Sequence, residues 1–153
     1  MSNKKSFAVG DPVPLFTLKD QHNSNFSIKD YLGKKKLVIY FYPKDESAVC
    51  TKEACAFRDS FTQFTDAGAL VIGINSGSVE SHRSFAEHHN LPFTLLSDPG
   101  NRVLKTFGIK GVLFLTGRET FVVDLSGKVA FQFRGFLKGD KHSENALAFL
   151  KKI

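Results

Sequence analysis

A strand that leads directly into a helix is the feature that most constrains the fold of this 153-residue chain. Residues 36–42 form an apolar, β-branched and aromatic run that ends at Pro43, which is typical of a buried central strand. Over residues 51–67, phenylalanines recur at spacings of four and three and form one apolar helix face, which Gly68 ends. The chain is therefore expected to pass from a buried strand into a helix within a few residues.

Both cysteines of the chain, Cys50 and Cys55, lie at this junction. A sulfur near the start of a helix faces the positive end of the helix dipole and unpaired backbone N–H groups, which favour the thiolate. Cys50 is therefore a candidate nucleophile. In a regular helix, Cα atoms five residues apart are separated by roughly 8.6 Å, whereas a disulfide tolerates about 7 Å at most. Bonding between the two cysteines thus requires local unwinding, which favours a redox switch over a structural crosslink.

The remainder of the chain alternates predicted strands and helices, which is the pattern of an α/β fold. A turn and a short strand are expected within residues 9–18. The other expected elements are strands over 69–75 and 93–96, a hairpin over 119–133, helices over 79–90, 98–107 and 141–151, and a loop over 109–117. No linker or internal repeat interrupts them. We expect a single domain over residues 1–153, in which residues 1–6 are a loose tail.

Charge and hydropathy argue against two kinds of partner. The net charge is +6 and the pI is near 9.4, but the basic runs are short and lie at residues 34–36 and 151–152. A solvated loop and a favourable helix C-terminus explain them, so no nucleic-acid partner is expected. No apolar run approaches the roughly 20 residues of a membrane span, and no signal peptide is recognisable. A cytoplasmic protein is expected, although an organelle form without its targeting segment has the same features.

Metal binding is not expected either. The two cysteines have no metal-binding spacing around them, and zinc would need further ligands from the scattered histidines. His82, His88 and His89 lie in one predicted helix, but no carboxylate pattern completes a site there. They are interpreted as surface histidines. Glu53 is interpreted as a first-turn acid that favours the helix dipole and is left outside the catalytic set.

The strand-to-helix junction resembles the active-site segment of peroxiredoxins, in particular the subgroup called peroxiredoxin Q or bacterioferritin comigratory protein. The residues that carry the likeness are Pro43, Ser47, Cys50, Thr51, Lys52, Glu53, Ala54, Cys55, Phe57, Arg58 and Asp59. The resemblance runs from about Val9 to the C-terminus. It implies a thioredoxin-like fold, with a central mixed sheet flanked by helices and a short N-terminal β extension.

The resemblance also implies a function, namely a thiol-dependent peroxidase that reduces hydrogen peroxide and alkyl hydroperoxides without metal, haem or flavin. Cys50 corresponds to the cysteine that attacks the peroxide and becomes a sulfenic acid, and Cys55 to the partner that forms an intramolecular disulfide with it. Arg118 corresponds to the arginine that points at the nucleophile, Pro43 to the residue that shields the pocket, and Ser47 to a hydroxyl that hydrogen-bonds thiolate and substrate. Thioredoxin or another dithiol protein is the implied reductant, and a monomer the implied state.

Two departures from the family pattern lie just before Cys50. Ser47 stands where threonine is usual, and Ala48 and Val49 replace a proline-glycine pair. Serine keeps the hydroxyl but lacks the methyl group that restricts the side-chain rotamer. Loss of proline and glycine removes one rigid and one permissive residue from the loop. Peroxidase chemistry is expected to survive both changes.

Two other functions compete with the peroxidase. A thiol–disulfide oxidoreductase on the same fold typically has its cysteines as Cys-x-x-Cys, and the wider spacing here argues against it. A non-catalytic binding or chaperone-like module would be expected to have lost the thiol, hydroxyl and guanidinium groups of Cys50, Ser47 and Arg118, and all three are present.

Overall fold

The computed structural model describes residues 8–109, 118–135 and 139–153. The predicted loose tail at residues 1–6 and nearly all of the predicted loop at 109–117 lie outside the described residues. Within the described part of the chain, no helix combines the length and apolarity needed to cross a membrane.

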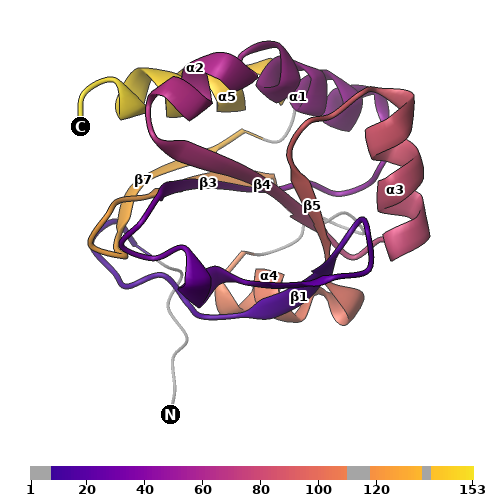
Figure 1. The fold of residues 1–153 in the computed structure, drawn as a ribbon, viewed down its shortest axis with the longest axis horizontal. Helices are drawn as coiled ribbons and strands as arrows, with labels where there is room; N and C mark the ends of the chain where they lie inside the picture. Colours follow the sequence, from indigo (N-terminus) through magenta and orange to yellow (C-terminus); the bar gives the residue numbers. More distant parts are fainter. Residues whose placement is uncertain (1–7, 110–117, 136–138) are drawn as a thin grey trace.

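Seven strands form one mixed sheet in the order β2-β1-β5-β4-β3-β6-β7 (Figure 1). At its centre, β3 (Lys36–Phe41), β4 (Ala69–Asn75) and β5 (Thr94–Ser97) are parallel. On one side, β6 (Glu119–Val123) and β7 (Val129–Arg134) continue the sheet antiparallel. At the other edge, β1 (Thr17–Asp20) and β2 (Asn25–Ser27) form an antiparallel pair. The predicted mixed sheet with a short N-terminal β extension is confirmed.

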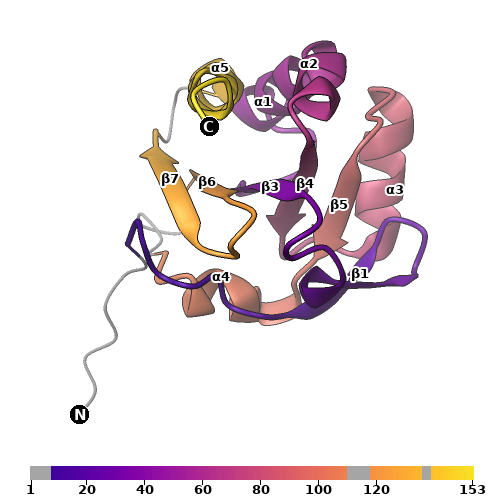
Figure 2. The same cartoon turned by 60° about the vertical axis from the view of Figure 1, so that its left-hand side comes forward.

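Helices cover both faces of this sheet. On one side lie α1 (Ala48–Asp59), α2 (Phe61–Asp66) and α5 (Gly139–Leu150), and α4 (Arg102–Thr106) lies on the opposite side (Figures 1 and 2). The helix α3 (Val79–His88) runs beside β5. Two short 3-10 turns complete the fold, at Ile28–Asp30 and Pro99–Asn101.

The core has two halves because side chains alternate between the faces of a strand. Along β3, Val38 and Tyr40 pack on the α1 side, where the ring of Tyr40 stacks on Phe57 with a centroid distance of 4.6 Å. Residues that alternate with them along the strand, such as Ile39 and Phe41, pack on the α4 side. There the ring of Phe41 lies 5.0 Å from that of Phe107, between centroids. The phenylalanine-rich composition thus fills both sides of one sheet.

The helix predicted over residues 51–67 is in fact two helices. It begins earlier, at Ala48, because the side chain of Ser47 caps it by accepting a hydrogen bond from the backbone N–H of Cys50. It breaks at Ser60, whose ψ of 12° is not helical, and α2 follows. Cys50 therefore lies in the first turn of α1, as its place at the strand-to-helix junction predicts.

Candidate active site

The sheet brings Cys50 and Arg118 together although they are 68 residues apart. Phe41, the last residue of β3, pairs with Glu119, the first residue of β6. The loop that leads to Cys50 and the residue that precedes β6 consequently lie at the same edge of the sheet. There Nη2 of Arg118 donates a hydrogen bond of 3.1 Å to the sulfur of Cys50, and both residues are buried. A buried guanidinium at this distance stabilises a thiolate.

The hydroxyl of Ser47 forms two hydrogen bonds with the backbone, one as acceptor and one as donor. Its oxygen accepts from the N–H of Cys50 at 3.4 Å, and the hydroxyl donates to the carbonyl of Lys44 at 3.2 Å. In this arrangement the hydroxyl proton is donated to the carbonyl of Lys44 and not to the sulfur. The predicted bond from Ser47 to the thiolate stays a prediction, and it requires the hydroxyl to turn.

Pro43 and Cys55 are both partly buried. Pro43 directly follows the buried Tyr42 at the start of the loop, and its role in shielding the thiolate stays a prediction. Cys55 lies within α1, one and a half turns after Cys50, and both are free thiols. The helix between them is unbroken, so a bond between the two sulfurs requires α1 to unwind.

Glu53 belongs to the site, and its interpretation as a first-turn acid that only favours the helix dipole was wrong. It is fully buried, and Nη1 of Arg118 donates a hydrogen bond to its Oε1. Burial raises the pKa of Glu53 to about 8, although Arg118 acts to lower it. Glu53 lies three residues after Cys50, and this spacing places both side chains on one helix face. That spacing was the sequence signal that could have identified it.

His142 of α5 lies behind Glu53. Its Nδ1 is 3.6 Å from Oε2 of Glu53 and 2.6 Å from the hydroxyl oxygen of Thr120. Its Nε2 donates to the carbonyl of Gly135 at 2.9 Å. Burial lowers the pKa of His142 to about 4, so the ring is neutral at pH 7. Because Nε2 carries the proton, Nδ1 accepts from Thr120 and has none to give to Glu53.

The loop before Cys50 is anchored through Asp45. One carboxylate oxygen accepts from the hydroxyl of Tyr42 at 2.6 Å, and the other accepts from Ser81 at 2.6 Å and meets Nδ1 of His82 at 2.7 Å. Burial acts to raise the pKa of Asp45, but the bonds from His82, Ser81 and Tyr42 outweigh it and lower the pKa. No local pattern in the sequence pointed to Asp45, because its partners are up to 37 residues away.

His82 is fully buried, so its interpretation as a surface histidine was wrong. Its Nε2 meets the carbonyl of Leu96 at 3.0 Å, while Nδ1 meets Asp45. Both ring nitrogens therefore have a polar partner, and the contact with Asp45 fastens the active-site loop to α3.

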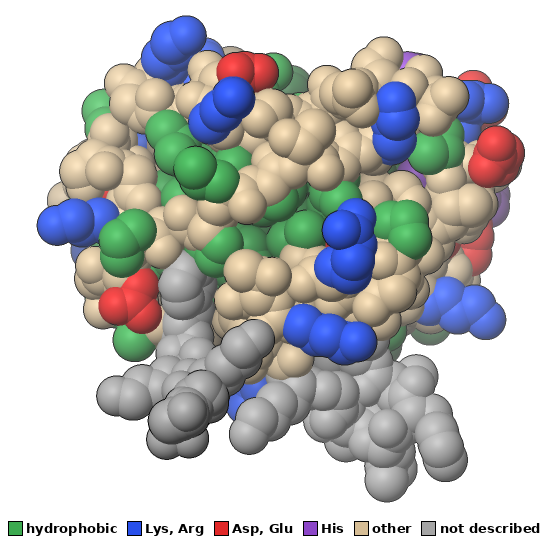
Figure 3. Space-filling model, turned by 90° about the horizontal axis from the view of Figure 1, so that it is seen from below, with side chains coloured by type: hydrophobic (Ala, Val, Ile, Leu, Met, Phe, Trp, Pro, Cys, Tyr) green, Lys and Arg blue, Asp and Glu red, His purple; other side chains and the backbone are tan. Residues whose placement is uncertain are grey.

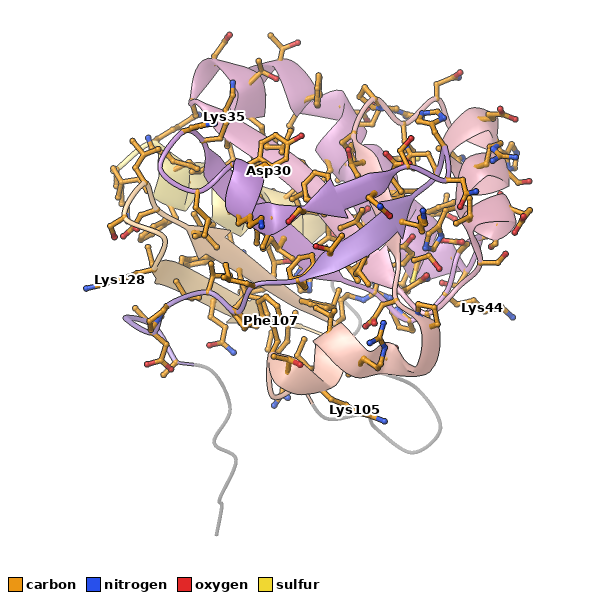
Figure 4. The ribbon with its side chains drawn as sticks, turned by 60° about the horizontal axis from the view of Figure 1, so that its bottom comes forward. Asp30, Lys35, Lys44, Lys105, Phe107 and Lys128 are labelled. Carbon is orange, nitrogen blue, oxygen red and sulfur yellow. The ribbon has the colours of Figure 1, made fainter. Side chains whose placement is uncertain are left out.

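Lysine and arginine side chains of the described residues lie at several separate places on the surface. On the face seen in Figure 3, Lys and Arg side chains are separated by uncharged atoms. Lys44, on the loop after β3, and Lys105, on α4, project outward from different parts of the molecule, whereas Phe107 turns inward (Figure 4). Among the side chains that the structure describes, Arg118 is the cation that donates a hydrogen bond to the Cys50 sulfur.

Comparisons with known proteins agree with one another. The AhpC/TSA family model matches residues 9–132. The chain is 47% identical to the chloroplastic peroxiredoxin Q of Sedum lineare over 146 residues, which cover 94% of this chain and 78% of that protein. It is 46% identical to the chloroplastic peroxiredoxin Q of Suaeda salsa, over 94% of this chain and 68% of the relative.

Solved structures give the same answer for the fold. The peroxidoxin BcpB of Mycobacterium tuberculosis superposes with a TM-score of 0.89 and 35% identity, over 96% of this chain and 98% of that one. The bacterioferritin comigratory protein of Xanthomonas campestris superposes with a TM-score of 0.86 and 29% identity, over 95% and 98%. The predicted thioredoxin-like fold is confirmed by these likenesses.

Proposed function

This chain belongs to the AhpC/TSA family, as a peroxidase of the peroxiredoxin Q type, and we propose that Cys50 is its peroxide-reducing cysteine. The observation that carries the proposal is the 3.1 Å hydrogen bond from Arg118 to the sulfur of Cys50. Because that sulfur also lies in the first turn of α1, two independent sources of positive potential favour the thiolate.

In the first step, the Cys50 thiolate attacks the terminal oxygen of a hydroperoxide. The O–O bond breaks and its electron pair goes to the second oxygen, which takes a proton from water and leaves as water or an alcohol, while the terminal oxygen stays on the sulfur with its hydrogen. The sulfur is oxidised to a sulfenic acid. Arg118 offers fixed N–H donors to the charge that moves from sulfur to oxygen, which is where preorganised donors accelerate a reaction.

In the second step, the thiolate of Cys55 attacks the sulfenic sulfur of Cys50, the S–O bond breaks as the disulfide forms, and the hydroxide takes a proton from solvent and leaves as water. The disulfide requires local unwinding of α1. Two features at the start of that helix favour unwinding. Its cap is a single long hydrogen bond of 3.4 Å from the Cys50 N–H to Ser47. The proline and glycine usual before the cysteine are replaced by Ala48 and Val49.

Recycling requires a dithiol protein, since disulfide exchange needs two thiols to return both cysteines to the reduced state. We propose thioredoxin for this role, with hydrogen peroxide and alkyl hydroperoxides as substrates. The bacterioferritin comigratory protein of Xanthomonas campestris, a relative with the same fold, has an alkyl peroxide reduction activity. A monomer suffices for the chemistry, because Cys50, Arg118 and Cys55 all come from one chain.

The proposal is tested by peroxide consumption coupled to thioredoxin and thioredoxin reductase. We expect the wild type to turn over, Cys50→Ser to be inactive, and Cys55→Ser to consume one equivalent of peroxide without thioredoxin turnover. A wild type that leaves peroxide unconsumed but reduces the disulfides of other proteins would instead support the thiol–disulfide oxidoreductase. If the wild type has neither activity, the result would support the non-catalytic binding or chaperone-like module.

A further inference from the structure

Two histidines and a glutamate form a cluster on the surface beside the active-site loop. Glu46 lies in that loop, His88 is the last residue of α3, and His89 is its C-cap. Nδ1 of His88 lies 2.8 Å from one carboxylate oxygen of Glu46, and Nε2 of His89 lies 2.9 Å from the other. The candidate ligand atoms of the three residues all lie within 4.8 Å of one another.

This set of atoms suits a divalent transition-metal ion. Zinc binds imidazole nitrogen and carboxylate oxygen at about 2.0–2.2 Å, and tetrahedral geometry then places ligand atoms about 3.4 Å apart. In the cluster the hydrogen-bonded nitrogen–oxygen distances are 2.8 and 2.9 Å, and every candidate ligand atom lies within 4.8 Å of the others. Side-chain rotations must therefore open the shorter distances to admit an ion. Two imidazoles favour zinc, copper or nickel over magnesium and calcium. Glu46 and His88 are exposed, so water has access to a fourth ligand position.

His89 and the backbone of Glu46 are held in place by their surroundings. The backbone carbonyl of His89 accepts a hydrogen bond of 2.8 Å from Nη1 of Arg58. The imidazole ring of His89 packs edge-on against Phe85. Glu46 has a φ of 65°, a left-handed conformation that costs a non-glycine residue on the order of 1 kcal/mol. The loop therefore holds Glu46 toward the two histidine rings at a cost in free energy. Because Glu46 is already positioned, less conformational entropy is lost when a metal ion binds.

We propose that Glu46, His88 and His89 form a binding site for a divalent transition-metal ion such as Zn²⁺. The ion connects the active-site loop to the end of α3. Because Glu46 directly precedes Ser47, the cap of α1, the bound ion opposes the unwinding that brings Cys50 and Cys55 together. It therefore slows disulfide formation. This consequence, unlike the binding itself, rests on the function proposed above.

Binding is tested on the full chain carrying Cys50→Ser and Cys55→Ser, so that thiols cannot take up zinc. Calorimetric titration with zinc chloride at neutral pH is expected to show one ion per chain. His88→Ala, His89→Ala and Glu46→Gln should each weaken binding by at least about tenfold. His22→Ala, at an exposed histidine in a turn, is the control and should not change it. Absence of binding, or binding that all three changes leave intact, overturns the proposal.

The effect on the helix is tested with both cysteines present. One equivalent of hydrogen peroxide is added to the reduced chain, with and without equimolar zinc, and disulfide formation is followed by quenched alkylation. We expect zinc to slow it several-fold in the wild type, and much less in the chain with both His88→Ala and His89→Ala. Equal slowing in both chains would mean that zinc acts on the thiols and would overturn the coupling. If neither chain reacts with peroxide, the proposed peroxidase activity is refuted. The calorimetric titration would still show whether the metal site exists.

Discussion

Cys50 and Glu53 lie three residues apart on one face of α1, and each accepts a hydrogen bond from the same guanidinium, that of Arg118. Burial raises the pKa of Glu53 to about 8, so this side chain is protonated at pH 7. A protonated carboxyl can orient Arg118 through its oxygen without neutralising it. The positive charge of Arg118 is thereby directed to the sulfur.

Arg118→Lys should slow the reaction of Cys50 with peroxide by at least about tenfold, or about 1.4 kcal/mol in the barrier. Lysine keeps the charge but lacks the planar fork that reaches Cys50 and Glu53 together. Rapid-mixing kinetics with hydrogen peroxide measure the rate constant. Arg134→Lys is the control, because Arg134 is largely exposed and pairs with Glu119 outside the site. Equal rates in wild type and Arg118→Lys would contradict a role for the guanidinium fork.

Substitutions of Glu53 separate its shape from its charge. Glu53→Gln keeps an uncharged side chain with an acceptor oxygen, so at pH 7 its peroxide rate should stay within about threefold of wild type. Glu53→Ala removes the acceptor that orients Arg118, and the rate should fall about tenfold. The same kinetic assay measures both variants. If Glu53→Gln were as slow as Glu53→Ala at pH 7, the carboxyl would have to act in its ionised form.

Glu53 also makes the stability of the chain depend on pH. Its pKa is about 8 in the folded chain and near 4.5 when unfolded, so between these values the folded state binds the extra proton. The free energy of unfolding should therefore fall as pH rises from 6.5 to 8, above the range in which His142 titrates, by on the order of 2 kcal/mol. Glu53→Gln should abolish this decline, whereas Glu87→Gln, at an exposed residue of α3, should leave it. Urea unfolding across this pH range measures the decline. A decline that persists in Glu53→Gln would refute its assignment to Glu53.

His142 makes the stability of the chain depend on pH in the opposite direction. Its pKa falls from 6.5 to about 4 on folding, so between these values the unfolded chain binds the extra proton. The contribution of His142 to the free energy of unfolding should drop as pH falls from 6.5 to 4, by on the order of 3 kcal/mol, against the opposite contribution of Glu53. The difference between the curves of wild type and His142→Asn should show this contribution. A matched His22→Asn change at the surface should not, and if it had the same effect the assignment to His142 would fail.

Asp45→Asn should destabilise the chain by about 3 kcal/mol, because it removes the carboxylate that meets the buried ring of His82. Asparagine also cannot accept all three bonds that Asp45 receives from Tyr42, Ser81 and His82. Urea unfolding at pH 7 gives the difference, with the exposed Asp59→Asn as control. A loss no larger than that of the control would show that the pair contributes little.

The local elements of this fold could be predicted from the sequence because each has a short-range signal. The apolar run at 36–42 and the phenylalanines at helical spacing identified β3 and the helices after it. The break at Ser60 was missed, since the apolar spacing continues across it without a proline or glycine. Helix periodicity reports which face is buried, and it does not report whether one helix or two supply that face.

The candidate site could be predicted only in part. Cys50 followed from its place at the strand-to-helix junction, whereas Arg118 followed from family resemblance alone. Glu53, Asp45 and His82 were missed or misinterpreted, because their partners are brought in by other strands and helices. No periodicity links residues 37 or 65 positions apart. Contacts of this kind depend on the sheet order, which the strand pattern alone leaves open.

The central claim is that peroxide oxidises Cys50 first and that Cys55 then bonds to it. Mass spectrometry of the reduced chain after one equivalent of hydrogen peroxide tests it most directly, with peptide mapping of both cysteines. We predict one Cys50–Cys55 disulfide in the wild type, and in Cys55→Ser a single oxygen atom on Cys50 that a sulfenic-acid reagent traps. Oxygen on Cys55 with Cys50 still reduced, or disulfides only between chains, would contradict the account.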